Sequence, residues 1–592
     1  MVTLATGIDG RPTLPMPIQG WARRSRAHGG PIQGLRGYPA PSFFAPLTST
    51  IVTRKSTGSA TFTRATTATV VDWEGVVRPV LSGEVRFQGA RRVQNRVAVS
   101  EDLTNGAWTT VGTGSKTATT STFTNSNYTH RINVNGGVGN GLKFVVSFKA
   151  SVTSGTADVR FETVDNSDGS DIVAITPTLT TTPTRYSFIA DYSASATIGT
   201  LTFQINRLGA ITAGTVMNFS ELQVEEVTGQ SNTNPAEYVS VGVLSAPYHG
   251  ANVDGVKCFT TQCGQTVASN VVTEATGATI PLTTTLGYLA EGAGTQLVTP
   301  TDAIRDFTGT WGLTNMTAAK TSTGVDGAAN SASRLTATGA TATALITLAG
   351  SSSRTCSAYI RRVTGTGTIK LTQGASKSAD LASSLNASTY TLVQFNASAD
   401  TSVTGYGIEI GTSGDAIDVD FFQFESGSAA TSRMASAGAV RNADVLLYPY
   451  AGNALTSIGT AYAELGMTYA TSNGTSIALT LGNTASSNLM YLPGSNPSTN
   501  ILIGDGTATA TKGSLTDMNT APRKRSSYWG RGATMGVSGD GLAPVTAAFD
   551  GTIGTVSVCI GCNSDGNGVW KGTIRNVRIW TSALSDAQIA GL

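Results

Sequence analysis

The sequence predicts an all-β protein, and three features of its 592 residues carry that prediction. From residue 61 onward, short runs that alternate apolar and polar residues are separated by Gly, Asn, Ser and Asp, which is typical of strands joined by tight turns. Helical periodicity is nearly absent until Ser585 and Gln588, which are spaced as a capping box for one short helix. One block of sequence also occurs twice. We therefore expect tandem β-sandwiches.

The composition excludes several classes of protein. Charged residues are only 13% and the net charge is +2, so the chain lacks the basic footprint of a nucleic-acid binder. The 40% of apolar residues is enough to bury real cores, which argues against disorder. No apolar run reaches the roughly 18 to 20 residues that cross a bilayer, and residues 1–20 lack the parts of a secretion signal. We expect no membrane and no nucleic-acid partner.

Five cysteines are too few, and odd in number, for a disulfide scaffold of this length. This favours synthesis in a reducing cytosol. Cys559 and Cys562 have the spacing of half a zinc knuckle, which Cys258 and Cys263 could complete. We favour buried thiols, because the pairs lie far apart in sequence and no histidine is near them.

Residues 1–60 are predicted to form an extended N-terminal anchoring arm, because they carry Gly, Pro and Arg without the periodicity of a core. Trp21 lies beside Arg23, Arg24 and Arg26 in this arm. This cluster either docks into an acidic surface of a neighbouring protein or forms a soluble tail, and we favour docking.

The repeat organises the middle of the chain. Trp108 and Trp311 each follow a Gly-Ala pair and an Asp-x-Thr turn, and Gln223 and Gln423 follow these tryptophans by 115 and 112 residues. We expect a first module with its lead-in at 61–245, a second at 246–444 and a separate domain at 445–592. A tryptophan repeated at a fixed position is either a core anchor, which we favour, or a ring that stacks on a sugar.

Several segments also resemble known modules. Residues 95–108 resemble the opening of jelly-roll domains found in tailed-bacteriophage virion proteins. Residues 572–586 resemble the last strand and cap of laminin-G-like, concanavalin-A-like lectin domains. Further matches to the phage modules are the lead-in at 63–76, the closing strand at 219–225, and the segments 431–434 and 441–445. The resemblance implies two jelly-roll modules, similar to carbohydrate-binding sandwiches, and a lectin-like C-terminal domain.

The same resemblance implies a structural protein of a tailed-phage virion, assembled in the host cytoplasm. We expect a fibre or spike that contacts host surface glycans, is held to other virion proteins by its N-terminal arm, and is a homo-oligomer, with a trimer favoured. The alternative is a head decoration or collar protein that stabilises the particle without binding a receptor. The second module has Thr295, Gln296 and Leu297 where the family has an Arg-Thr-Asn-Leu run, so no ligand residues are carried over.

Catalysis is not predicted. The three histidines, His28, His130 and His249, are scattered, and the sequence has no Gly-x-Ser-x-Gly nucleophile elbow. A glycan depolymerase would need a pair of carboxylates in a cleft, and no spacing in the sequence identifies one. We expect no catalytic residues.

One basic and aromatic cluster is a candidate glycan site. It combines cations with aromatic rings, which suits an anionic glycan. The alternative is a solvated or subunit-facing loop. The cluster consists of Arg523, Lys524, Arg525, Tyr528, Trp529 and Arg531.

A second candidate is a calcium loop. Asn563, Asp565 and Asn567 place oxygen ligands at positions 1, 3 and 5, with Gly568 at position 6, but Ile574 replaces the bidentate Glu. A Gly/Asn hairpin turn is the default interpretation. We expect no cofactor, with calcium as the alternative.

Overall fold

The computed structural model describes residues 37–592 except for short segments. These segments are 112–113, 124–128, 135–140, 168, 170–171, 195–197, 208–211, 263–264, 268–270, 274–280, 299–300, 349–353, 398–404, 428–429, 435–438, 469–475, 482–487, 493–497, 551–552 and 555–556. Trp21, Arg23, Arg24 and Arg26 lie outside the described residues, so docking by the arm stays a prediction. Residues 42–592 form one compact unit, and the description below concerns it.

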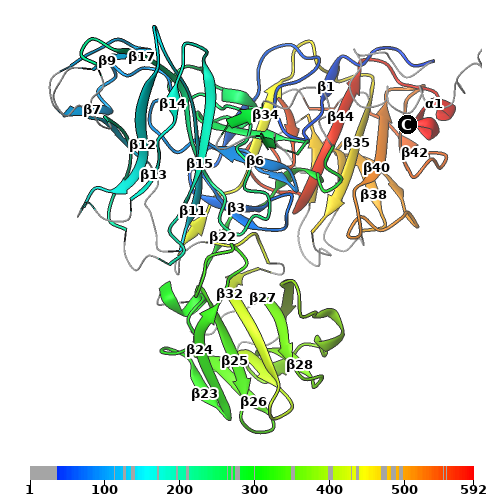
Figure 1. Cartoon of the computed structure of the whole chain (residues 1–592). Helices are drawn as coiled ribbons and strands as arrows, with labels where there is room; N and C mark the ends of the chain where they lie inside the picture. Colours follow the sequence, from blue (N-terminus) through cyan, green and yellow to red (C-terminus); the bar gives the residue numbers. More distant parts are fainter. Residues whose placement is uncertain are drawn as a thin grey trace, which may run out of the picture. The chain divides into compact units, whose positions relative to one another are not determined.

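The all-β prediction is confirmed, since the described residues form β-sandwiches built from antiparallel strands (Figure 1). The α-helix α1 (Asp586–Gly591) begins at Ser585, whose side chain and that of Gln588 form the predicted capping box. Within the described part of the chain, no helix is long and apolar enough to span a membrane. The described residues also include the 3-10 turns η2 (Tyr248–Gly250), η3 (Thr301–Ile304) and η4 (Ala382–Ser384).

The first sandwich encloses a core of aromatic rings, among them Phe148, Phe161, Phe203 and Phe219. One sheet has the order β7 (Trp108–Val111), β10 (Thr129–Asn133), β16 (Leu201–Arg207), β12 (Ala157–Asp165), β13 (Val173–Ile175), with β14 (Thr178–Leu179) beside β12. The other has the order β8 (Ser115–Lys116), β9 (Thr120–Thr122), β17 (Val216–Glu226), β11 (Lys143–Val152), β15 (Thr184–Asp191), β20 (Val271–Thr273), β19 (Gln265–Val267).

The second sandwich repeats this strand order, which confirms the tandem arrangement. One sheet has the order β23 (Gly312–Thr314), β26 (Ala342–Ile346), β31 (Tyr406–Ile410), β28 (Ile369–Gln373), β29 (Ser376–Lys377). The other has the order β24 (Met316–Ser322), β25 (Ala332–Ala337), β32 (Ala416–Ser426), β27 (Arg354–Thr364), β30 (Thr391–Asn396). Its core is self-contained, because all the buried residues of that cluster lie between Val298 and Phe424.

The C-terminal sandwich is assembled from separate parts of the chain. One sheet has the order β42 (Val545–Ala548), β41 (Thr534–Gly539), β40 (Arg523–Trp529), β35 (Gly459–Met467), β44 (Gly572–Trp580), β21 (Gly287–Ala290), β5 (Phe87–Gln88), with β1 (Phe43–Ala45) also beside β44. The other has the order β2 (Thr61–Thr63), β34 (Val445–Pro449), β43 (Ser557–Ile560), β36 (Ser476–Thr480), β37 (Asn488–Leu492), β38 (Ile501–Gly504), β39 (Thr509–Lys512).

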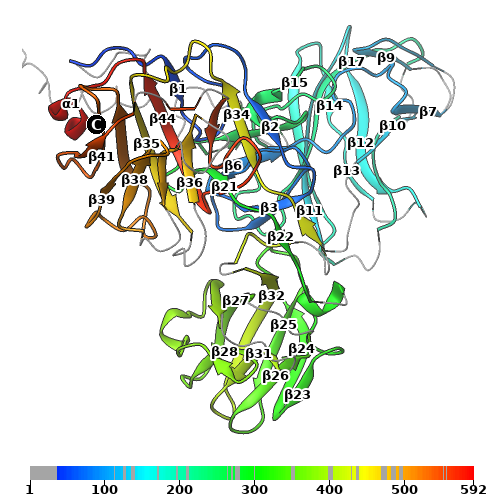
Figure 2. The ribbon, with the colours of Figure 1, turned by 180° about the vertical axis from the view of Figure 1, so that it is seen from behind.

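The predicted domain boundaries therefore need correction. β1 pairs with β44 and β2 with β34, so residues 43–63 belong to this C-terminal sandwich rather than to a coreless arm that ends at residue 60 (Figures 1 and 2). β20 pairs with β15 of the first sandwich, although it lies beyond the boundary predicted at residue 245. The physical reason is that strand pairing joins segments hundreds of residues apart, which local patterning cannot report.

Among the described residues, three two-stranded ribbons lie at the connections between the sandwiches: β3 (Ala68–Val71) with β4 (Val77–Val80), β6 (Arg91–Gln94) with β18 (Val256–Phe259), and β22 (Gly294–Thr295) with β33 (Val440–Arg441). A buried ion network lies among these connections. Asp444 is fully buried and pairs with Arg64 at 2.9 Å and with Arg86, while Arg86 also pairs with Glu291 at 2.7 Å. Burial alone would raise the pKa of Asp444, but the charges of Arg86 and Arg64 lower it. The network joins three segments distant in sequence.

Candidate functional site

The predicted glycan cluster is not a stacking surface. Its residues 523–529 form strand β40 rather than a loop, and Tyr528 and Trp529 are only 1% and 0% exposed. The indole Nε1 of Trp529 donates to the carbonyl oxygen of Leu455 at 3.0 Å. Arg525 is also fully buried and pairs with Asp540 at 2.7 Å. This prediction is therefore wrong for both rings: Trp529 packs in the core of the sandwich, and Tyr528, on the opposite face of the strand, is buried beneath Arg531.

The remaining cations of that cluster do not converge. Arg531 pairs with Asp586 at 2.5 Å and lies over the ring of Tyr528. Arg523 donates to Thr520 at 3.0 Å, and the side chain of Lys524 is exposed on the strand between them.

The predicted calcium loop is organised as a turn. The backbone N–H and the side-chain amide of Asn567 both donate to the carboxylate of Asp565, at 3.0 and 2.9 Å. The N–H of Gly566 donates to the carbonyl oxygen of Asn563 at 3.0 Å. Among the described residues no group of three or more His, Cys, Asp or Glu side chains could hold a metal ion. These contacts fit the hairpin turn, and calcium stays a prediction.

The interpretations of buried tryptophans and thiols agree with the structure. Trp108 and Trp311 are 3% and 5% exposed and lie in the cores of their sandwiches. The side chains of Cys559 and Cys562 are buried, and burial raises the pKa of Cys562 to about 12. Neither pair of residues presents a surface to a ligand.

The closing strand of each module makes the same set of hydrogen bonds, which we call the clasp. Gln223 of β17 accepts from the N–H of Val239 at 2.6 Å, and Gln423 of β32 accepts from the N–H of Met434 at 2.9 Å. In each module the same glutamine donates to the glutamate two residues later, at 2.7 Å. The repeated Gln-x-Glu pattern thus fixes the segment that follows the strand.

The opening of each module contributes an equivalent amide. Asn95 accepts from the N–H of Val224 at 3.1 Å, and Gln296 accepts from the N–H of Phe424 at 2.9 Å. Gln296 therefore makes in the second module the hydrogen bond that Asn95 makes in the first. Both modules have these amides and clasps, so these hydrogen bonds belong to the framework of the module fold.

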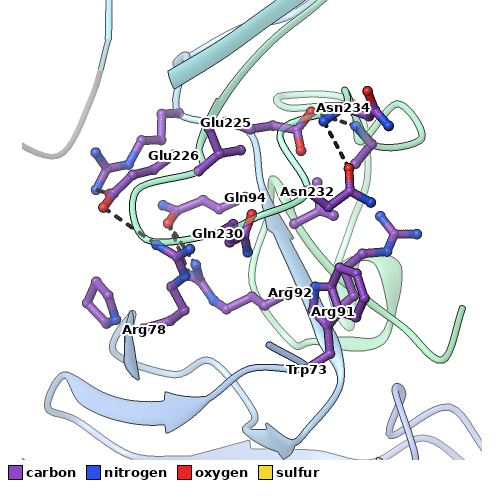
Figure 3. Close-up of a pocket in the computed structure, with 15 residues that line it drawn as sticks. Trp73, Arg78, Arg91, Arg92, Gln94, Glu225, Glu226, Gln230, Asn232 and Asn234 are labelled. Carbon is purple, nitrogen blue, oxygen red and sulfur yellow. Dashed lines mark hydrogen bonds and ion pairs between the residues drawn. The ribbon is translucent and has the colours of Figure 1, made fainter. Parts of the chain in front are cut away.

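A polar pocket lies where the β3–β4 ribbon and β6 meet the end of β17 (Figure 3). Its cavity measures about 30 Å³. Trp73 and Arg78 come from the ribbon, three arginines come from β6 and the residues after it, and the acids come from β17, as Figure 3 shows for most of them. Its charged and aromatic side chains include those of Trp73, Arg78, Arg91, Arg92, Arg96 and Glu226. We call this site the arginine pocket.

Two of its arginines share one carboxylate. Arg96 pairs with Glu226 at 3.0 Å, and Arg78 approaches the same carboxylate at 3.8 Å. Arg78 also pairs with Asp72 at 3.1 Å, and Asp72 accepts from the backbone N–H groups of Glu74 and Val76. The buried Asp72 therefore fixes both the turn of the ribbon and the position of Arg78.

The other two arginines are anchored from outside the cavity. Arg92 makes a bidentate pair with Glu84 at 2.6 and 2.7 Å. Arg91 pairs with Glu237 at 2.6 Å and donates to the carbonyl oxygen of Thr261 at 2.8 Å. Such anchoring holds guanidinium groups in fixed positions, which is what recognition of a small polar group requires.

Four buried N–H donors of this pocket lack a hydrogen-bond partner among the described residues. The arginines that carry three of them are at most 9% exposed. Buried polar groups are nearly always satisfied, so four orphaned donors around one cavity call for an explanation. The donor atoms are Trp73 Nε1, Arg78 Nη2, Arg91 Nη1 and Arg96 Nη1.

The arginine pocket belongs to the first module alone. In the second module, the framework places Thr295, Leu297 and Ser426 at the positions of Gln94, Arg96 and Glu226. The pocket is therefore an addition to the fold and not part of the module's framework.

Sequence reasoning missed this site. The basic run at residues 91–96 was a usable signal, because three arginines occur within six residues. Trp73 and Glu226, however, lie 153 residues apart. Only the tertiary structure brings them to one cavity.

No protein family and no curated protein matches the chain. One similar solved structure is a CBM4 module (15% identity, 23% of this chain, 94% of that one, TM-score 0.16). Two others come from Xyn10C of Paenibacillus barcinonensis: the CBM22-1 xylan-binding domain (14% identity, 24% and 98%, TM-score 0.18) and the CBM22-1–CBM22-2 tandem (11% identity, 56% and 98%, TM-score 0.18).

Proposed function

We propose that this chain is a non-catalytic structural protein that binds saccharide, displayed as a fibre or spike on the virion of a tailed bacteriophage. The arginine pocket is the observation that carries the binding part. It combines fixed, buried donors with an aromatic side chain, and sugars are recognised through convergent polar groups beside apolar ring surface. The phage context rests on the sequence resemblance described above.

The absence of catalysis is also part of the proposal. Glu225 and Glu226 are the two acids of the pocket. Glu225 accepts from Gln223 and from the N–H of Ala236, and Glu226 pairs with Arg96. Neighbouring residues of a strand point to opposite faces, so these acids do not flank one scissile bond.

Retention of the purified full chain on immobilised host surface polysaccharides tests the binding part. Wild type is expected to be retained and Arg96→Leu to elute early, whereas Lys524→Ala, in the rejected basic cluster, elutes as wild type does. Retention that is lost with Lys524→Ala but kept with Arg96→Leu would contradict the proposal. A reducing-sugar assay on the same polysaccharides, with sustained release of sugar ends, would overturn the absence of catalysis.

Antibody labelling of intact particles tests the placement. Label on tail-borne fibres or at the tail tip supports adhesion. Label over the head or collar favours the second candidate, a decoration or collar protein. The buried ion network and the interlocked C-terminal sandwich favour that candidate. Both features hold distant segments of the chain together, and neither exposes a surface to a ligand.

A further inference from the structure

We infer that the arginine pocket takes a single carboxylate of an acidic saccharide. This inference rests on the proposed function and narrows it to uronate-type glycans. Three properties of the pocket lead to it, namely the kind of orphaned atoms it holds, its size and its charge.

The orphaned atoms are all donors. Three guanidinium N–H groups and one indole N–H lack partners, and among the described residues no buried side-chain acceptor that lines the pocket is orphaned. A sugar hydroxyl both donates and accepts, so it would leave its own hydrogen without an acceptor here. A carboxylate only accepts, and its two oxygens offer about four lone-pair sites, which matches the four donors.

The size of the cavity fits one small group. A volume of about 30 Å³ holds roughly two water-sized atoms. That is room for the two oxygens of a carboxylate and too little for a whole sugar ring. The sugar ring would remain outside the cavity, beside Trp73. The side chain of Trp73 is half-buried in the turn between β3 and β4.

The charges around Arg96 favour the binding of an anion. Burial and the charges of Arg92 and Arg78 hold the pKa of Arg96 below its usual value, although Glu226 acts in the opposite direction. Burial also raises the pKa of Glu225 to about 7. Near neutral pH this carboxyl is only partly ionised, so it repels an incoming anion less than an ordinary glutamate would.

The second module supplies the test variant. Arg96→Leu combined with Glu226→Ser reproduces the residues found at these positions in the second module, and it leaves the net charge of the chain unchanged. The introduced leucine would pack where Arg96 now lies over Phe144, as Leu297 packs against its own core. A second variant, Trp73→Phe, removes one donor and keeps the ring.

The experiment measures binding of the full chain to carboxylated polysaccharides by biolayer interferometry. The probes are polygalacturonate, alginate, hyaluronan and polysialic acid, each beside its methyl-esterified form, with dextran sulfate as a polyanion without carboxylates. We expect binding to at least one carboxylated probe, no binding to its ester, and weakening of about tenfold or more in both variants. Arg131→Leu, which removes an exposed guanidinium paired with Asn166, is the matched control and should bind as wild type.

Each other outcome overturns the inference in a recognisable way. Equal binding of ester and acid means that a neutral saccharide occupies the pocket, and the proposed function survives. Binding of dextran sulfate alone, or binding that both variants keep, rejects the carboxylate at this site. If no polysaccharide binds to wild type at all, the proposed function fails together with the inference.

Discussion

At the scale of single residues, this chain buries charge in pairs and networks. Asp444 illustrates the principle, since it holds Arg64 and Arg86 from two sides with all three side chains inaccessible to solvent. Breaking such a pair leaves an uncompensated charge in the interior, whereas an exposed pair contributes little. The cost of a substitution therefore depends on burial and much less on the length of the ion pair.

Asp444→Asn should destabilise the protein by about 3–5 kcal/mol, because it leaves two buried guanidinium groups without their shared charge. Asp586→Asn, which loses the exposed pair with Arg531, should cost less than about 1 kcal/mol. Urea unfolding, monitored by tryptophan fluorescence, measures the free energy of unfolding of both variants. Equal effects of the two substitutions would contradict the role assigned to Asp444.

The carboxyl of Glu225 predicts a dependence of stability on pH. Burial raises its pKa from 4.5 to about 7, against hydrogen bonds from Gln223 and Ala236. The folded state then binds the proton more tightly than the unfolded state, so this group costs stability as pH rises. Between pH 4.5 and 7 wild type should lose up to about 1.4 kcal/mol per pH unit relative to Glu225→Gln, measured by thermal unfolding.

Glu464→Gln is the control of opposite sign. Burial alone would raise the pKa of Glu464, but the hydrogen bond and charge of Arg575 outweigh it and lower the pKa. Wild type should therefore gain stability over this variant as pH rises through the acidic range. A stability difference for Glu225→Gln that is independent of pH would show that its pKa is not raised.

At the scale of elements, one short strand decides where a domain begins. β1 has only three residues, but all of them are buried, and Phe43 packs edge-on against Tyr448 with ring centroids 4.9 Å apart. The register of β1 on β44 pairs Phe43 with Ile579. The beginning and the end of the compact unit are thus held by one sheet.

Phe43→Ala should destabilise the C-terminal sandwich by about 3–5 kcal/mol, since it removes a fully buried ring from its core. Val52→Ala, at a side chain that is 52% exposed, should stay within about 0.5 kcal/mol of wild type. Differential scanning calorimetry of the two variants measures these changes in stability. A negligible effect of Phe43→Ala would mean that β1 is dispensable to this core.

At the scale of the whole molecule, the three sandwiches differ in how independent they are. The buried core of the second comes from one continuous stretch, whereas the core of the third includes residues from Phe43 to Ala90 and from Tyr288 to Ala290. A domain that lacks strands of both its sheets exposes unpaired backbone groups and apolar surface. Continuity of the core therefore predicts which segment folds alone.

Residues 293–434 expressed alone should unfold cooperatively on heating, because their core is complete. Residues 445–592 alone should show no cooperative transition, because β1, β2, β5 and β21 are missing. Circular dichroism melts of the two fragments make the comparison. Cooperative unfolding of residues 445–592 would show that the added strands decorate an autonomous sandwich.

Strand periodicity, the turn residues and the repeat determined by themselves the all-β class, the tandem modules, the capped C-terminal helix and the buried roles of Trp108 and Trp311. All of these depend on neighbours in sequence or on a fixed spacing. The tertiary structure alone decided that residues 43–63 complete the C-terminal sandwich, that the rings of Tyr528 and Trp529 are buried, and that Trp73, Arg96 and Glu226 meet in one pocket. Each of these depends on pairing between distant strands, and the free energy of that pairing comes from burial, which no local pattern records.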